Sequence, residues 1–303
     1  MVRIKDLTDE TLLTPGHTAC SGCGVATAIR NMMKVLGKNT VVYNPACCLM
    51  IFTAMYPNFA WKIPYHHVAF ENSAICACGI KRAYKKLGKD DVQVVAIAGD
   101  GGTADIGLQA LSGAAERNED ILYVMVDNEA YMNTGIQRSG CTPYGAWTTT
   151  TPVGKVIAGK KEHKKDVPMI MLAHDVPYIA TASVGYMKDF LDKVEKAKKI
   201  KGFRYLQVFT PCPTGWRSDT AKTIELAKMA VDCGMYTLFE AEYGRLRITR
   251  KPKMTPIRNY LLAQGRFRHL KDEDIEELQR WVNEKWRRDE ALAKTYEELY
   301  GKE

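Results

Sequence analysis

Short runs of β-branched and aromatic residues alternate with longer segments of helical periodicity along most of this chain. That alternation constrains the fold more than any other feature, because strands separated by crossover helices assemble into a mostly parallel sheet. The predicted strands are TVVYN at 40–44, VQVVAIA at 92–98, ILYVMV at 121–126, YIATAS at 178–183 and RYLQVF at 204–209. The predicted helices span about 23–36, 71–87, 104–117, 187–200 and 220–232. We therefore predict an α/β fold with helices on both faces of the sheet.

The C-terminal part of the chain follows a different pattern. The segment DEDIEELQRWVNEKWRRDEAL, residues 272–292, has the spacing of an amphipathic helix. Its apolar residues fall roughly on one face: Ile275, Leu278, Val282 and Trp286. No internal repeat or flexible linker divides the chain, and TRKPKMTPIRNY is where the sheet should give way to an extension. We predict one α/β domain over 1–245 and a helical C-terminal extension over 246–303, whose helix either docks a partner through Trp281 and Trp286 or packs on its own sheet.

Charge and hydropathy exclude two classes of partner. The net charge of +8 comes from 43 Lys and Arg against 35 Asp and Glu, and it is spread along the chain. The densest basic clusters, KDFLDKVEKAKKIKGFR and KKEHKKD, do not interleave aromatic residues as a single-strand-binding surface does, so we expect no nucleic-acid partner. The longest apolar stretch, CCLMIFTAMY, is too short to span a bilayer, and MVRIKDLTDE does not read as a secretory signal. We expect no membrane partner and a cytoplasmic protein.

The nine cysteines point to metal or redox chemistry. An odd number in a chain expected to stay in a reducing compartment makes a disulfide framework a poor interpretation. Cys20 and Cys23, in GHTACSGCG, have the spacing of a metal or redox pair. By itself such a pair is more often half of a zinc site or a redox dithiol, and four thiolates hold structural zinc as well as iron.

The loops that follow the strands carry the candidate site, because ligands of open parallel sheets bind outside the carboxyl ends of the strands. Four of these loops are unusually informative: PACCLM, GDGGTAD, DNEAYMNTG and TPCPTGW. Two of them contain cysteine, and the other two contain Asp and Asn. The sequence therefore predicts that cysteines and oxygen ligands meet at one edge of the sheet.

The GDGG turn at 99–102 has the features of a phosphate site. Its glycines, which let a phosphate approach the backbone, are Gly99, Gly101 and Gly102. The helix predicted to begin near Thr103 points its amides at that phosphate, and Asp100 offers a carboxylate. A GDG turn alone is more often a plain turn. Asn128 follows the next strand, however, so a carboxylate, an amide oxygen and a nearby backbone carbonyl can complete an octahedral Mg²⁺ with diphosphate oxygens.

Taken together, these motifs resemble a known family. GDG followed by Asn at this distance resembles the thiamine diphosphate motif, and DNEAYMNTGIQRSGCTPYGAWTTTTPVGK closely resembles the β subunit of pyruvate:ferredoxin oxidoreductase and related 2-oxoacid:ferredoxin oxidoreductases. The resemblance runs from GHTACSGCG through VFTPCPTGW to PIRNYLLAQGRFRHL, which is most of the chain. It implies a thiamine diphosphate-binding fold, in which Asp100 and Asn128 bind Mg²⁺ by side chains and Ala130 by its carbonyl. It also implies that Asn133 faces the thiazolium as the catalytic residue of this chain. Asp127 stands where many thiamine enzymes have a first asparagine, which fits this family.

The same resemblance implies one 4Fe-4S cluster beside the thiamine ring. The matching ligand positions are Cys20, Cys23, Cys48 and Cys212. Two of them follow predicted strands, and Cys23 lies at a predicted helix start, where the helix dipole favours a thiolate. Cys47 neighbours Cys48 and is the alternative ligand. We expect the remaining cysteines to be buried small hydrophobes: Cys76, Cys78, Cys141 and Cys233.

The reaction that the resemblance implies converts a 2-oxoacid, coenzyme A and oxidised ferredoxin into acyl-CoA, CO₂ and reduced ferredoxin, as in anaerobic metabolism. Pyruvate is the expected substrate, and a sister enzyme for branched-chain 2-oxoacids or oxalate would keep the same motifs. Expected partners are an α-type subunit with the pyrimidine-binding domain, electron-transfer subunits with iron–sulfur clusters, and ferredoxin. A non-oxidative thiamine enzyme with structural zinc remains an alternative. His66 and His67 either approach the cofactor or are structural, and Arg138 either meets an anion or caps its loop.

Overall fold

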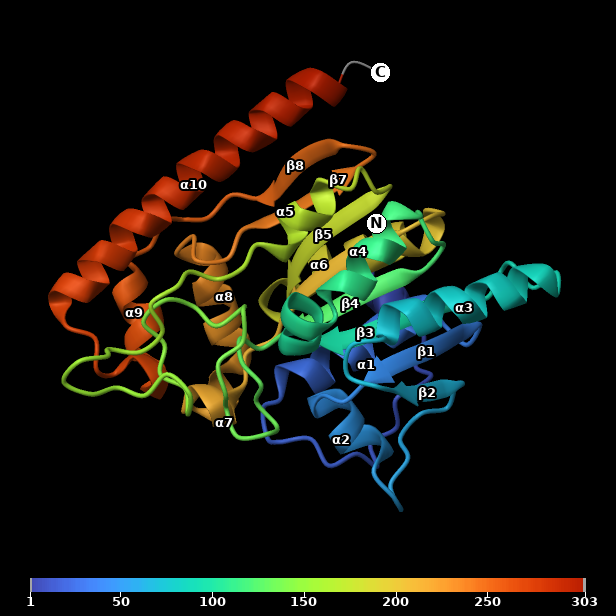
Figure 1. Ribbon diagram of the computed structural model, residues 1–303, viewed down its shortest axis with the longest axis horizontal. Coiled ribbons are helices and arrows are strands. Elements are labelled where there is room, and N and C mark those ends of the chain that lie inside the picture. The colour runs from blue at the N-terminus through green and yellow to red at the C-terminus, as the bar shows by residue number, and fades with distance from the viewer. Residues whose placement is uncertain (1, 302–303) are drawn as a thin grey trace.

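An eight-stranded sheet forms the centre of the computed structural model, which describes residues 2–301 (Figure 1). The strand order is β2-β1-β3-β4-β6-β5-β7-β8. The strands are β1 (Thr40–Pro45), β2 (Tyr65–Val68), β3 (Gln93–Gly99), β4 (Leu122–Asp127), β5 (Tyr178–Ser183), β6 (Arg204–Phe209), β7 (Leu238–Glu242) and β8 (Arg245–Arg250). From β2 to β5 neighbouring strands are parallel, whereas β7 and β8 pair antiparallel. The predicted mostly parallel α/β sheet is confirmed.

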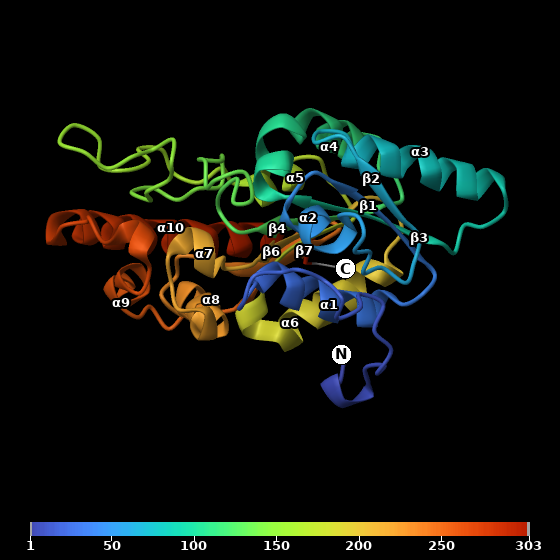
Figure 2. The ribbon, with the colours of Figure 1, turned by 90° about the horizontal axis from the view of Figure 1, so that it is seen from below.

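Helices cover both faces of this sheet, as predicted. They are α1 (Gly24–Leu36), α2 (Cys48–Ala54), α3 (Ser73–Lys86), α4 (Leu108–Glu116), α5 (Val167–Leu172), α6 (Met187–Lys199), α7 (Pro213–Trp216), α8 (Thr223–Asp232), α9 (Ile257–Leu262) and α10 (Asp272–Tyr300). In Figure 2, α1, α6 and α8 lie on one side of the sheet and α3 and α4 on the other. Strands β1, β4, β5 and β6 are buried along their whole length, because both of their faces are covered.

Each predicted strand is present within one residue at either end, but three strands were not predicted. Strand β2 is short and polar, and it exposes His66 and His67 at the edge of the sheet. The β7–β8 hairpin carries charges on its outer positions, and its two-residue turn, Tyr243-Gly244, has positive φ at both residues. The helix predicted over 104–117 begins earlier than expected, with a wide π-helical turn at Gly102–Ile106 before α4.

The C-terminal helix α10 packs on its own sheet and lies along β8 (Figure 1). Its buried apolar residues are Ile275, Leu278 and Val282. Trp286, which was expected on the same face, is only partly buried. Asp289 is buried, and its carboxylate pairs with Lys285. The domain boundary expected at 245/246 falls at the first residue of β8, so one strand of the sheet lies on the extension side of it. Across the described residues, no helix has both the length and the apolar composition needed to cross a membrane.

Candidate cofactor site

The carboxyl ends of β1, β3, β4 and β6 bring the four informative loops to one edge of the sheet. A cavity of about 280 Å³ opens there. Its lining combines the glycine turn at 99–102, residues 128 and 130–134, and the adjacent thiols of Cys47 and Cys48. The predicted oxygen ligands therefore share a cavity with Cys48, one of the four predicted cysteine ligands, and with its alternative Cys47.

The glycine turn is held closely by its neighbours. A Cβ atom at Gly101 would lie 2.2 Å from the ring of Tyr131, so only glycine fits beneath that ring. The Tyr131 hydroxyl donates to Asp105 at 2.8 Å, which fixes the ring over the turn. Thr103 donates to the carbonyl of Gly99 at 2.8 Å and closes the first turn of the helix that follows. The turn from Gly99 to Gly102 lines the cavity, and its glycines have no side chains that would keep a phosphate away from the backbone.

Three potential metal ligands converge beside this turn. One terminal atom of the Asn128 amide lies 3.0 Å from Oδ1 of Asp100 and 2.9 Å from the carbonyl oxygen of Ala130. With nitrogen at that position, Asn128 donates to both oxygens; with oxygen there, three oxygens face one point. Neighbouring ligands of an octahedral Mg²⁺, with bonds of about 2.1 Å, lie about 3.0 Å apart. The spacing of these atoms therefore fits a Mg²⁺ ion.

An unusual backbone conformation brings the Asn128 and Ala130 ligands together. Glu129 lies between them with a φ of +69°, a left-handed conformation that side-chain-bearing residues rarely adopt. Its carbonyl accepts a hydrogen bond of 2.7 Å from the Thr142 hydroxyl. Its carboxylate pairs with Lys164 at 3.0 Å and with Arg266 at 2.5 Å. These contacts hold the strained residue from two sides.

The charged side chains next to the site form pairs of opposite charge. Lys164 also pairs with Asp127, so two carboxylates and two cations form one buried chain from Asp127 to Arg266. Burial opposes charge on Glu129, but Lys164 and Arg266 together lower the pKa of its carboxyl. Burial likewise opposes charge on Lys164, yet Asp127 and Glu129 raise its pKa well above the ordinary value. None of these partners except Asp127 was predicted from sequence.

Among residues 2–301, Asp100 has no such cationic partner in direct contact. Burial, and next the nearby charge of Asp127, raise the pKa of its carboxyl well above the ordinary value. Its Oδ2 accepts the hydroxyl of Ser139, while the other oxygen faces Asn128. The thiol of Cys141 also lies within 4.8 Å of the carboxylates of Asp100 and Asp127, so this cysteine borders the site. A cation bound at Asp100 would offset the energetic penalty of burying this carboxylate.

The four predicted cysteines come from three helix starts. Cys23 is the N-cap of α1, Cys48 is the first residue of α2, and Cys212 is the N-cap of α7. Cys20 is joined to this group by the hydrogen bond from the amide of Cys23 to its carbonyl, 3.1 Å. Burial, then the nearby thiols, raise the pKa of Cys48, and burial raises the pKa of Cys212 to about 11. Such buried, mutually close thiols are stable as thiolates only when a metal replaces their protons.

The spacing of these thiols is wider than a zinc site requires. Within residues 2–301, no three of the four predicted cysteines have sulfur atoms within 4.8 Å of one another. Thiolates on a tetrahedral zinc, with bonds of about 2.3 Å, lie about 3.8 Å apart. A four-iron cluster takes each thiolate on a different iron and therefore needs a wider spacing. As they are placed, these cysteines do not form a compact zinc site among residues 2–301.

The alternative ligand Cys47 lies beside the other cysteines but faces the strand ends. Its sulfur accepts the Asn44 amide at 3.2 Å, and its Cβ lies 3.5 Å from the position that a Cβ at Gly99 would occupy. Cys48, by contrast, is close enough to Cys23 and Cys212 for their charges to affect its pKa. The geometry thus favours Cys48 over Cys47 as the residue facing the cysteine group.

The other candidates divide between the cavity and the surface. Asn133 lines the cavity and is exposed at its mouth. His66 stacks on Tyr43, and His67 contacts the carbonyl of Asn44 at 3.1 Å, so both have structural partners on the edge strand. Arg138 lies 3.7 Å from Glu162 on the surface. Of the cysteines expected to be buried, Cys78, Cys141 and Cys233 are buried, whereas Cys76 is only partly buried because it lies near the outer side of α3.

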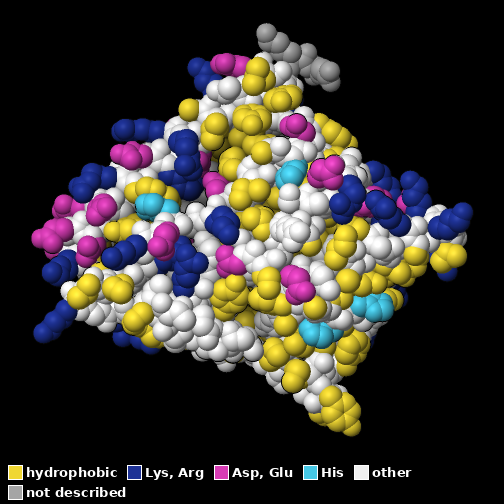
Figure 3. Space-filling view, in the orientation of Figure 1, with side chains coloured by type: hydrophobic (Ala, Val, Ile, Leu, Met, Phe, Trp, Pro, Cys, Tyr) yellow, Lys and Arg dark blue, Asp and Glu magenta, His cyan; other side chains and the backbone are white. Residues whose placement is uncertain are grey.

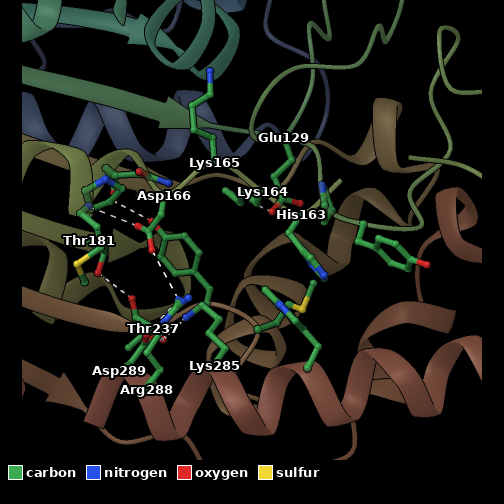
Figure 4. Close-up of a pocket in the computed structure, with 18 of the residues that line it drawn as sticks. Glu129, His163, Lys164, Lys165, Asp166, Thr181, Thr237, Lys285, Arg288 and Asp289 are labelled. Atoms are coloured by element: carbon green, nitrogen blue, oxygen red, sulfur yellow. Dashed lines mark hydrogen bonds and ion pairs between the residues drawn. The ribbon is translucent and has the colours of Figure 1, made fainter. Parts of the chain in front are cut away.

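A second cavity of about 300 Å³ lies between α10 and the sheet. Figure 4 shows Glu129 and Lys164 on its wall, opposite Lys285, Arg288 and Asp289 of α10. Its carboxylates already have cationic partners, for example Asp289 with Lys285 at 2.6 Å. This cavity is larger than the one at the glycine turn, but the convergent ligands described above do not line it.

Comparison with known proteins agrees with this picture. Residues 46–208 match the model of the thiamine pyrophosphate enzyme C-terminal TPP-binding domain. Pyruvate synthase subunit PorB of Methanothermobacter thermautotrophicus is 54% identical over 91% of this chain and 96% of the relative. Ketoisovalerate oxidoreductase subunit VorB of Pyrococcus abyssi is 51% identical over 93% of both chains. A solved 2-oxoglutarate:ferredoxin oxidoreductase from Magnetococcus marinus, with 2-oxoglutarate, coenzyme A and succinyl-CoA bound, has a TM-score of 0.56 and 26% identity over 74% of this chain and 79% of that chain.

Proposed function

This chain belongs to the β-subunit family of 2-oxoacid:ferredoxin oxidoreductases, and we propose that it is the β subunit of a pyruvate:ferredoxin oxidoreductase. It is thus a thiamine pyrophosphate-binding subunit of an oxidoreductase that works with partner subunits. The observation that carries the proposal is the convergence of Asp100, Asn128 and Ala130 on one point beside the cysteine group. The overall reaction is oxidation of pyruvate with coenzyme A to acetyl-CoA and CO₂, with reduction of ferredoxin.

The residues around the first cavity would hold thiamine diphosphate through Mg²⁺. Asp100 and Asn128 would bind the ion by their side chains and Ala130 by its carbonyl, and the backbone from Gly99 to Gly102 would receive the diphosphate. Bound thiamine diphosphate supplies an electron sink for decarboxylation of the 2-oxoacid, and an iron–sulfur cluster accepts the electrons singly. Asn133, at the cavity mouth, would position the reacting end of the substrate by its amide.

The cysteine group would hold one 4Fe-4S cluster close to that cofactor. Cys20, Cys23, Cys48 and Cys212 are the proposed ligands. Cys48 lines the cofactor cavity itself, so the two sites share a wall. Met132 lines the cofactor cavity as well. Its sulfur packs against Gly215 of α7, in the space that a Cβ at that position would need. These side chains would keep water from the region between the two groups.

Substrate choice rests on similarity more than on geometry. The PorB and VorB relatives are named for pyruvate and ketoisovalerate, and both match this chain at about half identity. Pyruvate is proposed because the two most similar of these relatives are PorB subunits, at 54% and 52% identity, although other PorB relatives, at 46–51%, are no more similar than the VorB relatives at 50–51%. Branched-chain 2-oxoacids and oxalate remain alternatives, since selection of the side chain is expected mainly from a partner subunit. The zinc-containing non-oxidative alternative is disfavoured by the wide spacing of the thiols.

The proposed partners are an α-type subunit with the pyrimidine-binding domain, electron-transfer subunits with iron–sulfur clusters, and ferredoxin. One surface feature supports a partner close to the cofactor cavity. The loop after α2 exposes Met55, Tyr56 and Phe59, and Tyr56 is 98% exposed. Figure 3 shows the resulting hydrophobic projection at the lower end of the molecule.

We place the enzyme in the cytoplasm, in keeping with nine free thiols.

Cofactor analysis of the assembled enzyme tests this proposal. Enzyme prepared without oxygen should contain iron, sulfide and thiamine diphosphate in proportion to this chain. Cys212→Ser should lose iron, because serine oxygen is a poor ligand for iron–sulfur clusters. Cys233→Ser should keep it, because Cys233 is the buried C-cap of α8 and its thiol donates to the Ala230 carbonyl. Stoichiometric zinc without sulfide, in protein made with ample iron, would contradict the assignment.

A further inference from the structure

Trp216 connects the two candidate sites directly. It is fully buried, and its indole N–H donates a hydrogen bond of 2.9 Å to the backbone carbonyl of Asn128. Asn128 is the residue whose side chain faces Asp100. Trp216 also ends α7, the single helical turn that begins immediately after Cys212. One residue therefore contacts a proposed metal ligand by its side chain and lies on the same helical turn as a proposed cluster ligand.

The other end of α7 contacts the cysteine itself. The amide of Trp216 donates to the carbonyl of Cys212 at 2.9 Å, and the amide of Gly215 points to the Cys212 sulfur at 3.4 Å. Amide hydrogen bonds to cysteine sulfur are one means by which a protein tunes an iron–sulfur cluster. Because α7 has only one turn, these two hydrogen bonds tie Trp216 directly to Cys212.

The indole ring of Trp216 is held in place by Arg266, which stacks on it. The guanidinium of Arg266 stacks on the ring at 3.9 Å from its centroid, and Arg266 is itself buried. Arg266 pairs with Glu129, the left-handed residue that follows Asn128. Lys164 holds the other oxygen of Glu129, and Figure 4 shows these two side chains together on the wall of the second cavity. Trp216 thus hydrogen-bonds the carbonyl of Asn128. Arg266 and Lys164 hold the side chain of the next residue, Glu129.

We propose that Trp216 is a positioning residue that fixes the metal ligand Asn128 against the cysteine loop, so that affinity for Mg²⁺–thiamine diphosphate depends on whether the cluster is in place. This inference rests on the proposed function. It adds a physical connection between the two proposed sites, which runs from the Asn128 carbonyl through Trp216 to Cys212. Without this connection the two sites would only lie close together. Linkage requires the dependence to be reciprocal.

The first test compares two buried tryptophans in the assembled enzyme. After removal of the cofactor with a chelator, Mg²⁺ is titrated at fixed thiamine diphosphate and binding is followed by calorimetry. Trp216→Phe keeps an aromatic ring but removes the five-membered ring with its N–H, and the Mg²⁺ concentration for half-saturation should rise about tenfold, the size of one buried hydrogen bond. Trp61→Phe is the control, because its indole N–H bonds only the Thr53 hydroxyl, at 2.9 Å. Its Mg²⁺ requirement should stay at the wild-type value.

A double-mutant cycle separates coupling from packing. Cys212→Ser, which removes the cluster, should raise the Mg²⁺ requirement about threefold in the wild-type background and leave it unchanged in the Trp216→Phe background. Equal effects of Cys212→Ser in both backgrounds, or a wild-type Mg²⁺ requirement in Trp216→Phe, would overturn the inference.

Two further measurements keep the test decisive. If Trp216→Phe does not fold, Arg266→Lys replaces it, because lysine cannot stack flat on the indole. A raised Mg²⁺ requirement in Arg266→Lys supports the inference, and an unchanged one counts against it. The iron, sulfide and thiamine diphosphate content of the wild-type enzyme is measured first. Absence of these groups there would mean that the proposed function itself fails, whereas their presence with an uncoupled Trp216 would refute only the link.

Discussion

Asp100 shows how much of this site depends on single residues. It is almost fully buried, no cation of residues 2–301 pairs with it, and its Oδ1 lies 3.0 Å from one terminal atom of the Asn128 amide. An isolated buried carboxylate is costly, which is why its pKa is raised. The Ser139 hydroxyl satisfies only one of its two oxygens. A divalent cation at the other oxygen would restore the charge balance.

Changing Asp100 to Asn should therefore weaken Mg²⁺-dependent binding of thiamine diphosphate without dismantling the cysteine group. The substitution keeps the size of the side chain but removes its charge, so we expect the Mg²⁺ requirement to rise at least tenfold. Calorimetric titration of the cofactor-stripped enzyme measures it. Asp91→Asn, an exposed aspartate before the opposite end of β3, serves as control. An unchanged Mg²⁺ dependence in Asp100→Asn would show that the glycine turn is only a turn.

Motif spacing in the sequence predicts some residues of the site, but it does not predict their long-range partners. Asp100 and Asn128 follow adjacent parallel strands, so the register of β3 and β4 brings them together and the sequence shows it. Arg266 pairs with Glu129 across 137 positions, and no local pattern indicates such a contact. The same holds for Trp216 and Asn128, which lie 88 positions apart. Long-range partners of a motif are fixed by the packing of α7 and the tail, which depends on the whole chain.

At the scale of elements, the cysteines are placed by helix starts. Three helices, α1, α2 and α7, begin at or next to Cys23, Cys48 and Cys212. The close approach of α1 to the β6 loop is possible because position 24 is glycine: a Cβ there would lie 2.8 Å from the carbonyl oxygen of Pro211. Packing of the first helix against the last cysteine loop thus assembles the group from distant segments.

The strands that sequence patterns missed explain where such patterns stop working. Strands β1, β3, β4, β5 and β6 are apolar because both faces are covered, and their run length and β-branched content show it. Strand β7 carries Glu240 and Glu242, which pair with Lys196 of α6, so tertiary ion pairs replace the apolar signal. Strand β2 is an exposed edge, where packing places few demands on the sequence.

The packing of α10 against the sheet gives a prediction at this scale. Leu278 is 1% exposed and belongs to the same core as Ile257 and Leu261 of α9, whereas Leu299 on the same helix is 69% exposed. Leu278→Ala should lower the free energy of unfolding by about 2–4 kcal/mol, and Leu299→Ala by no more than about 0.5 kcal/mol. Urea unfolding of the two variants side by side measures the difference. Equal stabilities would mean that α10 does not share the core of the sheet.

At the scale of the whole molecule, one edge of one sheet carries both proposed groups, and this edge is open to a partner. The cofactor cavity opens where Asn133 and Thr134 are exposed, and the apolar loop with Tyr56 projects beyond α2. Residues 46–208, which match the thiamine pyrophosphate-binding domain, carry β2, β3, β4, β5 and nearly all of β6, while β1 immediately precedes them and β7, β8 and the tail helices complete the other side of the sheet. Under the proposed function, the described residues would supply the diphosphate-binding half of a thiamine site.

The partner requirement follows from this arrangement. Thiamine enzymes hold the cofactor between two α/β domains, and the second domain binds the aminopyrimidine ring and provides the glutamate that activates it. In residues 2–301 the single sheet provides the diphosphate side, with Asp100 and Asn128 at its edge, and the tail after β8 consists of helices α9 and α10. We therefore expect this chain alone to reduce a viologen dye with pyruvate and coenzyme A at no more than about one thousandth of the rate of the chain mixed with its α-type partner, because loss of positioning and of general acid–base catalysis each costs orders of magnitude. The assay is run without oxygen on protein whose iron content is known, so that a missing cluster is not mistaken for a missing partner. Comparable turnover by the isolated chain would refute the requirement, since it would mean that this one sheet also activates the pyrimidine ring.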